Sequence, residues 1–413
     1  MVTAMTAGTP QSADTLREQM VDDLLADGTI VSPSVERAFR EVPRHLFAPD
    51  AELGHAYARD IVVVKRDEHG IPVSTVSAPE IQARMLEQAQ IRPGMRVLEV
   101  GSGGYNAALC AELAGPSGQV TTVDIDPDVT GRASSFLGAA GYSRVRVVLA
   151  DAEAGVLDGA PYDRIIVTAG AWDIPPAWTD QLAPDGMLVV PLRMRGITRS
   201  LALAGSADGS CLEARSAEVC GFVRMQGTGA HAERLWLLRG KQVGLRFDDG
   251  ALEQPDMLDG VLGGEPGAAW SGVMVRKDEP FETLPLWLAS VLPGFCVLAV
   301  DAGGDGPGIA VEPGGRWFPF AAVTGDSLAY LSTRPAGELV EFGAHGYGPH
   351  AAEAAAALAG QVTAWNRSYR DGPAPAIAAW PADTPDAAVQ REGTRTAVIR
   401  KTHRLITISW PLD

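Results

Sequence analysis

The sequence predicts an α/β fold with a Rossmann-like parallel sheet, followed by an added C-terminal α+β domain. Two observations support the first part. A buried strand, a glycine-rich turn and a helix follow one another in residues 97–113, "VLEVGSGGYNAALCAEL", as in the first half of a nucleotide-binding unit. Strand-like and helix-like patterns then alternate as far as residue 192. Beyond it, short strand-like runs dominate, with one long helical pattern at 351–369.

Composition divides the chain into three parts. At 413 residues it is long for a single domain, and its 46% of hydrophobic residues can fill more than one core. We expect a disordered N-terminus at 1–14, an α/β domain with an N-terminal helical segment at 15–195, and an extension at 196–413. Within the extension, "DGPAPAIAAWPADTPDAA" at 371–388 reads as a proline-rich loop crossing.

The glycine-rich turn favours one class of ligand over another. Gly101 and Gly103 leave backbone that a ligand can approach closely. The turn has neither the Lys-Ser/Thr ending of a P-loop nor the third glycine of a dinucleotide fingerprint. Glu99, at the end of the strand, would repel a pyrophosphate. A cationic ligand fits better, and S-adenosylmethionine carries both a sulfonium and an ammonium group.

Acidic residues also end the next two strands. The second strand, 120–123, leads into Asp124 and Asp126, and an acid at this point can accept both ribose hydroxyls of an adenosine. The third leads into Asp151, placed to meet an adenine amino group. The fourth begins near Asp163 and ends in small residues. This ordered set predicts an S-adenosylmethionine site, whereas one acidic loop alone would indicate only an ordinary α/β domain.

The segment before the turn contains a second candidate site. In "VSTVSAPEIQARMLEQ" (73–88), Ser77 and Glu80 have the spacing of a capping box, and Pro79 suits the first turn of a helix. Ser77 is therefore expected to cap this helix. Alternatively, its hydroxyl and the first helical amides face a substrate carboxylate, since helix N-termini bind anions. The two roles are compatible.

Charge and composition exclude several other classes. A formal net charge of −17 opposes nonspecific nucleic-acid binding. The chain lacks an apolar run of membrane-spanning length and a signal-peptide pattern, so we expect a cytoplasmic protein with no membrane partner. The four cysteines are scattered, as in reduced thiols. His345 and His350 have no legible third partner, so no metal site is predicted.

Taken in order, these segments resemble the protein L-isoaspartate O-methyltransferase family. The similarity spans roughly residues 15–192, and its family-specific parts are the "PR-x-x-F" stretch (Pro43, Arg44, Phe47) and the "T-x-S-x-P" stretch (Thr75, Ser77, Pro79). The resemblance implies a class I S-adenosylmethionine-dependent methyltransferase fold. It also implies methyl transfer to a carboxylate, with S-adenosyl-L-homocysteine as the product.

The resemblance also implies site residues. Ser77 matches the family's active-site serine, with Thr75 beside it. Gly101 and Gly103 match the first cofactor motif together with Glu99, Asp124 matches the ribose-binding acid, and Asp151 matches the adenine-loop acid. The neighbouring residues Ser102, Ile125 and Ala152 complete the predicted cofactor-binding set.

Departures from the family pattern suggest a narrower role. The turn is one residue shorter than usual, "SAPEIQ" stands where "SAPHMH" is common, and over 200 residues follow the core. These features are similar to actinobacterial variants that accompany ribosomally synthesised, modified peptides, including lanthipeptide-type systems. Such variants esterify an aspartate in a constrained peptide, and the ester closes to a succinimide that can open to isoaspartate. The extension would then recognise the peptide, or alternatively support oligomerisation.

Three other functions remain open. The first is general repair of isoaspartate in proteins, and the second is methylation of a small molecule or another protein. The third is cofactor binding without catalysis. The first two would retain the cofactor strands, and the third would retain the glycine turn.

Overall fold

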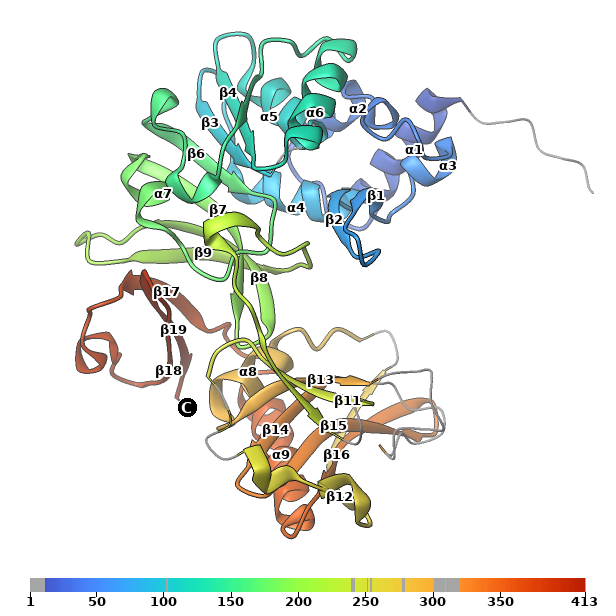
Figure 1. Ribbon diagram of the computed structural model, residues 1–413, viewed down its shortest axis with the longest axis vertical. Coiled ribbons are helices and arrows are strands. Elements are labelled where there is room, and N and C mark those ends of the chain that lie inside the picture. The colour runs from blue at the N-terminus through green and yellow to red at the C-terminus, as the bar shows by residue number, and fades with distance from the viewer. Residues whose placement is uncertain are drawn as a thin grey trace, which may run out of the picture. The chain divides into compact units, whose positions relative to one another are not determined.

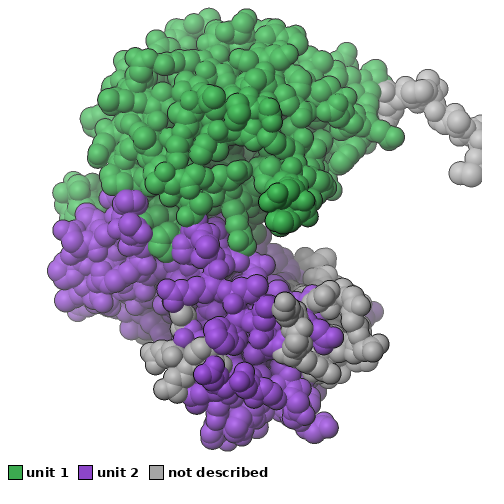
Figure 2. Space-filling model, viewed as in Figure 1, with its two compact units in different colours: residues 1–192, 199–230 green, residues 193–198, 231–413 purple. Residues whose placement is uncertain are grey.

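The computed structural model describes residues 12–101, 103–238, 242–250, 252, 255–276, 279–300, 309 and 319–412. The chain divides into two compact units, which Figure 2 colours separately. Unit 1 comprises residues 1–192 and 199–230, and unit 2 comprises residues 193–198 and 231–413. Among the described residues, no helix is long and apolar enough to cross a membrane.

The sheet of unit 1 has the strand order β9-β8-β7-β6-β3-β4-β5 (Figure 1). Strands β3 to β7 are joined by parallel pairings, and β8 and β9 form an antiparallel pair. The bounds are β3 Arg96–Val100, β4 Gln119–Asp124, β5 Arg146–Leu149, β6 Tyr162–Val167, β7 Leu182–Met194, β8 Ile197–Gly205 and β9 Leu212–Val219. The predicted class I methyltransferase fold and its strands are therefore confirmed.

The strand order determines where a ligand can bind. From β3 the chain proceeds through β4 to β5 on one side, and then returns to add β6 and β7 on the other. The order thus reverses between β3 and β6, and open parallel sheets bind ligands beyond the carboxyl ends of strands at such a point. The buried runs of β3 and β6 are typical of strands covered on both faces.

Helices surround this sheet: α1 Ala13–Ala26, α2 Pro33–Glu41, α3 Leu53–Ala56, α4 Pro79–Ala89, α5 Tyr105–Ala114, α6 Pro127–Ala139 and α7 Pro176–Asp180. The helix after the glycine turn, α5, is buried along almost its whole length because it packs against β3, β4 and α2. Its Ala- and Leu-rich sequence has no polar face, as expected of a fully covered helix.

The N-terminal segment differs in part from the expectation of disorder at 1–14. The Ser12 hydroxyl accepts a hydrogen bond from the Thr15 N–H and caps α1, so residues 13 and 14 are already helical. Residues 1–11 lie outside the described part of the chain. After α3, a hairpin of β1 (Val62–Arg66) and β2 (Pro72–Val76) leads into α4.

Unit 2 contains an antiparallel sheet with the order β10-β11-β13-β14-β15-β16-β12, and a smaller group ordered β18-β19-β17. The strands are β10 Arg234–Leu238, β11 Val243–Phe247, β12 Gly267–Arg276, β13 Phe295–Val300, β14 Phe320–Thr324, β15 Ser327–Ala336, β16 Leu339–Tyr347, β17 Ala376–Pro381, β18 Thr394–Arg400 and β19 Arg404–Pro411. Helix α8 spans Thr283–Val291, and α9, at Ala351–Ser368, packs on β12, β15 and β16.

The α+β character predicted for the extension is confirmed, as is its long helix, but one loop is not. The segment 371–388 was expected to cross as a loop, yet residues 376–381 form β17, paired with β19. The prediction is wrong there because "AIAAW" carries strand-forming apolar residues between its prolines, and Pro381 stands at the end of the strand, where a proline is tolerated.

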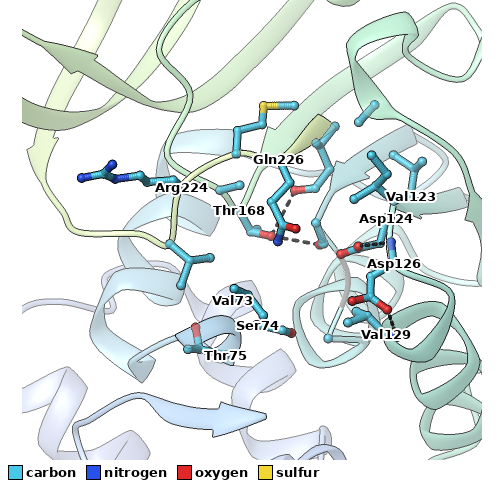
Figure 3. A pocket seen from close by; sticks show the side chains of 18 of the residues that line it. Val73, Ser74, Thr75, Val123, Asp124, Asp126, Val129, Thr168, Arg224 and Gln226 are labelled. Atoms are coloured by element: carbon cyan, nitrogen blue, oxygen red, sulfur yellow. Dashed lines mark hydrogen bonds between the residues drawn. The ribbon is translucent and has the colours of Figure 1, made fainter. Parts of the chain in front are cut away.

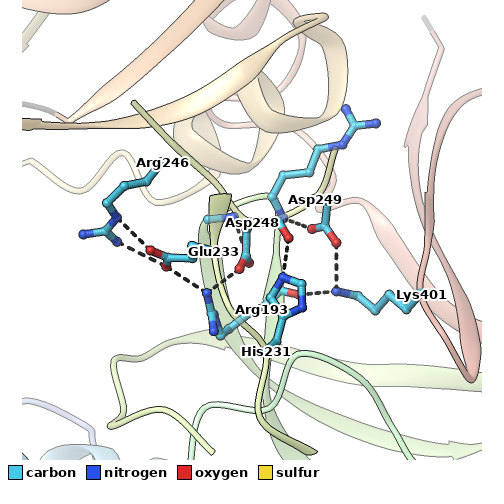
Figure 4. A network of polar contacts seen from close by, with 9 residues as sticks. Arg193, His231, Glu233, Arg246, Asp248, Asp249 and Lys401 are labelled. Carbon is cyan, nitrogen blue, oxygen red and sulfur yellow. Dashed lines mark hydrogen bonds and ion pairs between the residues drawn. The ribbon is translucent and has the colours of Figure 1, made fainter. Parts of the chain in front are cut away.

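A charged network lies at the start of unit 2 (Figure 4). Arg193 pairs with Asp248 and with Glu233. Lys401, whose side chain is 0% exposed, donates from Nζ to the Arg193 carbonyl at 2.8 Å and lies 3.5 Å from Asp249. Removing one member of such a buried set weakens the compensation of the remaining charges, which is costly.

The structure divides the two units at positions other than the predicted boundary at 195/196. Arg195 and Gly196 have φ values of 52° and 83°, as in the two-residue turn of a tight hairpin between β7 and β8. Because the chain reverses there, most of β8 and all of β9 extend the sheet of unit 1. The chain leaves unit 1 for the last time after residue 230.

Candidate active site

An open cavity, about 710 Å³ with the solvent space at its mouth included, lies at the carboxyl ends of β3, β4, β5 and β6 in unit 1 (Figure 3). Further walls come from β2, through residues 73–75, and from residues 223–226, which follow β9. This is the reversal point of the sheet, where open parallel sheets bind their ligands.

The glycine turn forms one wall with bare backbone. Gly101 has a φ of +92°, and a Cβ on it would lie 2.7 Å from the Thr168 Oγ1 atom. That hydroxyl donates to the Gly101 carbonyl at 2.9 Å, and the Gly101 N–H donates to the Val123 carbonyl at 2.8 Å. The turn is thus fixed to both neighbouring strands, and a side chain at 101 would clash. Gly103 also lines the cavity, whereas Ser102 lies outside the described residues.

Glu99 lies close to the turn without lining the cavity. It is 1% exposed, and its Oε2 atom accepts a hydrogen bond of 2.6 Å from the Thr122 hydroxyl. Burial raises the pKa of Glu99 to about 7, although hydrogen bonds from Thr122 and Asn106 oppose the rise. Its carboxyl group therefore lies in the core behind the glycine turn.

The two aspartates after β4 have different surroundings. Asp126 caps α6 by accepting from the Asp128 and Val129 N–H groups, and it pairs with Lys65 at 2.6 Å. Asp124 accepts from the Asp126 N–H at 2.9 Å and lines the cavity, together with Ile125. The cap and the lysine thus occupy Asp126, and Asp124 is the better placed of the two for a ligand.

Asp151 holds together the opposite wall. Its Oδ1 atom accepts from the Glu153 N–H, and its Oδ2 atom accepts from the Thr228 N–H at 2.8 Å. Burial opposes ionisation, but these backbone hydrogen bonds outweigh it and lower the pKa of Asp151. The predicted adenine contact would have to share a carboxylate that already fixes the chain at residue 228. Ala152, beside it, also lines the cavity.

Residues 223–228 cross the cavity, and sequence reasoning missed this segment. The Gly170 N–H donates to the Val223 carbonyl at 2.8 Å, and the Met225 N–H donates to the Gly170 carbonyl at 3.2 Å. At the other end, a Cβ on Gly227 would lie 2.5 Å from Asp151 and 2.6 Å from Ile125. The glycines of "QGTG" were the available signal, since they permit this close approach.

The predicted cap at Ser77 is wrong. Helix α4 begins at Pro79, its N-cap residue is Ala78, and no side chain caps it. Ser77 stands one residue too early, and Glu80 pairs with Arg59 at 3.2 Å instead of completing a capping box. Thr75 lines the cavity, whereas Ser77 is outside the lining.

Arg44 fixes the backbone that carries Ser77. Its buried guanidinium donates to the Ser77 carbonyl at 2.8 Å, to the Ala56 carbonyl at 2.7 Å and to the Gln82 side chain at 2.8 Å. It also lies 5.0 Å from the centre of the Tyr105 ring, at the start of α5. The "PR-x-x-F" stretch thereby connects the β2–α4 loop to the helix that follows the glycine turn.

The residues of this cavity fit S-adenosylmethionine. The Asp124 carboxylate would accept ribose hydroxyls, and the apolar side chains of Ile125, Val129 and Met225 would flank an adenine ring. Bare backbone at Gly101 and Gly103 would lie along the methionine part, with Thr75 nearby. These acidic and apolar side chains differ from the nests of backbone N–H groups that bind phosphates.

The sequence of this chain is similar to those of known proteins. The family model for protein-L-isoaspartate(D-aspartate) O-methyltransferase matches residues 15–229. A protein-L-isoaspartate O-methyltransferase of Hyperthermus butylicus is 41% identical over 220 residues, which are 51% of this chain and 88% of the relative. That of Methanopyrus kandleri is 39% identical over 213 residues, which are 51% of this chain and 91% of the relative.

Solved structures of the same name also align with the chain. One protein-L-isoaspartate O-methyltransferase is 20% identical with a TM-score of 0.49, covering 88% of this chain and 96% of its own. Another, from Plasmodium falciparum in complex with S-adenosyl-L-homocysteine, is 18% identical with a TM-score of 0.45, covering 52% and 99%. The family model and the 41% identical relative establish that this chain belongs to the protein-L-isoaspartate O-methyltransferase family. The members of this family are S-adenosylmethionine-dependent carboxyl O-methyltransferases.

Proposed function

We propose that this enzyme esterifies an aspartate or isoaspartate carboxylate in a constrained, modified precursor peptide. The methyl ester then closes to a succinimide, which opens to isoaspartate. We further propose that Asp124, Gly101 and Gly103 hold the cofactor, supported by Ile125, Asp151 and Ala152. Thr75 and the hydroxyl of Ser77 would hold the acceptor.

Few groups are needed for this chemistry. S-adenosylmethionine, when bound, supplies an activated methyl group. A carboxylate is ionised at neutral pH, so it needs no general base and must only be oriented. Orientation would come from the β2–α4 loop, which Arg44 fixes through the Ser77 carbonyl. In the released ester, the next backbone nitrogen attacks the carbonyl carbon, a C–N bond forms, and the C–O bond breaks with loss of methanol.

The observation that carries the peptide proposal is the extent of unit 2. The family model ends at residue 229, whereas the chain continues to 413 with a separate hydrophobic core around Leu245, Leu298 and Tyr330. An isoaspartyl group in an unfolded chain requires little further recognition, so a second unit of this size supports a larger, shaped substrate. We propose residues 196–413 as its recognition region.

General repair of isoaspartate in damaged proteins is the second candidate. The names of the relatives favour it, since they act on L-isoaspartate and are about 40% identical over the catalytic unit. In that case unit 2 would support stability or oligomerisation, and the enzyme would accept short linear isoaspartyl peptides.

Mass spectrometry with matched peptides separates these candidates. The full chain and S-adenosylmethionine are incubated with an aspartyl macrocycle, its linear form and a linear isoaspartyl peptide of the same sequence. The proposal expects the macrocycle to gain a methyl group and then lose methanol, with little reaction of the linear forms. Preference for the linear isoaspartyl peptide would instead establish repair, and no methylation of any peptide would contradict both.

A further inference from the structure

Residues 223–228 run along the cavity, and four of them, 223–226, line it. Thr228 and Gly227 lie against Asp151 and Ile125, where an adenosine would bind. Val223 is instead paired with Gly170, just beyond β6. The segment therefore runs from the adenosine end towards the end where the methyl group and the acceptor carboxylate must meet.

The cavity is lined by more acidic side chains than basic ones. Among the described residues that line it, Asp124, Asp126 and Asp151 are acidic, and Arg224 is the one basic residue. Any acceptor carboxylate must approach these like charges. A cation on the approach side would offset the repulsion and would select an anionic acceptor over its amide.

Among the described residues that line the cavity, Arg224 is the one that could supply such a cation. Its backbone is held on both sides, because the carbonyl of Val223 and the N–H of Met225 bond to Gly170. Its side chain is exposed, and Figure 3 shows it well apart from Asp124, with its guanidinium extending away from that carboxylate. The base of the side chain is thus fixed at the cavity wall, and its charged end is exposed and points away from Asp124.

We propose that the Arg224 guanidinium binds the acceptor carboxylate and makes the site specific for acidic side chains. A guanidinium can pair with both carboxylate oxygens, which fixes the plane of the group as well as its position. Methylation removes the negative charge, so the ester product loses this interaction and can leave. The inference rests on the proposed function, since it concerns the substrate of that reaction.

Steady-state kinetics of the full-length enzyme test this role, with the peptide that wild type methylates among the macrocyclic and isoaspartyl peptides above. Arg224→Ala is expected to raise the KM for the peptide about tenfold or more, with a smaller change in kcat, because the lost bond is made in the ground state. Arg224→Lys should recover part of the loss, since it keeps the charge without the fork, and Arg224→Glu should be weaker than Ala.

Two further measurements distinguish this role from a structural one. Affinity for S-adenosylmethionine and thermal stability should not change in Arg224→Ala, and the KM of wild type should rise more steeply with salt than that of the variant. Arg215→Ala is the matched control, because Arg215 is half exposed on β9 and lies outside the cavity.

The outcomes are separable. If wild type methylates a peptide and Arg224→Ala has an unchanged KM, this inference is overturned and the proposed function stands. A rise in KM accompanied by an equal loss of cofactor affinity would also overturn it, because the arginine would then serve the cavity as a whole. Failure of wild type to methylate either peptide would overturn both.

Discussion

The buried carboxyl group of Glu99 gives this protein a specific pH dependence of stability. Burial raises its pKa from the ordinary 4.5 to about 7. Below pH 4.5 the folded and unfolded states both carry the proton, and no penalty arises. Between pH 4.5 and about pH 7, Glu99 ionises only in the unfolded chain. The free energy of unfolding therefore falls by about 1.36 kcal/mol for each pH unit. Above pH 7 the folded state ionises as well, and the loss levels off at about 3 kcal/mol.

Glu99→Gln removes this titration and keeps an oxygen that can accept from Thr122. We therefore expect the difference in unfolding free energy, Gln variant minus wild type, to increase by about 3 kcal/mol between pH 4.5 and 7.5. Any offset from the new amide is the same at both pH values and cancels. The assay is urea denaturation, followed through tryptophan fluorescence, to which the buried Trp178 of unit 1 contributes.

A control variant isolates the effect of burial. Glu68→Gln makes the same chemical change at a side chain that is 87% exposed, and its unfolding should follow wild type across the pH range. A Glu99→Gln difference that stays constant with pH, or that shrinks as pH rises, would refute the reasoning. It would mean that the Glu99 carboxyl group is ionised in the folded core.

The other predictions concern the cofactor, the acceptor loop and the network of unit 2. Asp124→Asn should weaken S-adenosylmethionine binding by about 1.5–3 kcal/mol in calorimetry, and an unchanged affinity would remove Asp124 from the site. Ser77→Ala should change stability by no more than about 0.5 kcal/mol, because Ser77 caps nothing, yet should slow methylation; normal turnover would show that the hydroxyl is dispensable. Lys401→Met should destabilise unit 2 by about 3–5 kcal/mol in denaturant unfolding, since it removes a buried cation beside Asp249 and the donor to the Arg193 carbonyl. Lys65→Met, at a surface ion pair, is its control, and equal losses in the two variants would contradict the burial argument.

The sheet of unit 1 could be predicted because its signals are local. Strands β3 and β4 are short apolar runs that end in an acid, and in parallel sheets such ends gather at one edge. The positions of Asp124 and Gly101 beside the cavity follow from that rule alone. The cap at Ser77 failed because its spacing also fits a helix that begins one residue later, with Pro79 in its first turn.

Other parts of the site depend on contacts between distant residues. Arg224 lines the cavity because the chain after β9 returns to Gly170, and apart from the glycines of "QGTG" no pattern near Arg224 indicates that return. The contact of Glu99 with the ligand stays a prediction, and the sequence did not indicate that the neighbouring strand supplies Thr122 as a partner inside the core. Register between strands decides such pairings, and one sequence does not contain it in readable form.

The contact between Lys401 and the carbonyl of Arg193 joins residues 208 positions apart, which has a consequence for synthesis on the ribosome. Unit 1 has all of its residues once position 230 has emerged, so we expect it to fold while unit 2 is still being made. The turn at 193–198 is made early, yet it must remain in water until the last strands of the chain arrive. A ribosome that stalls shortly before residue 401 would thus present a finished methyltransferase site on a chain whose second unit cannot close.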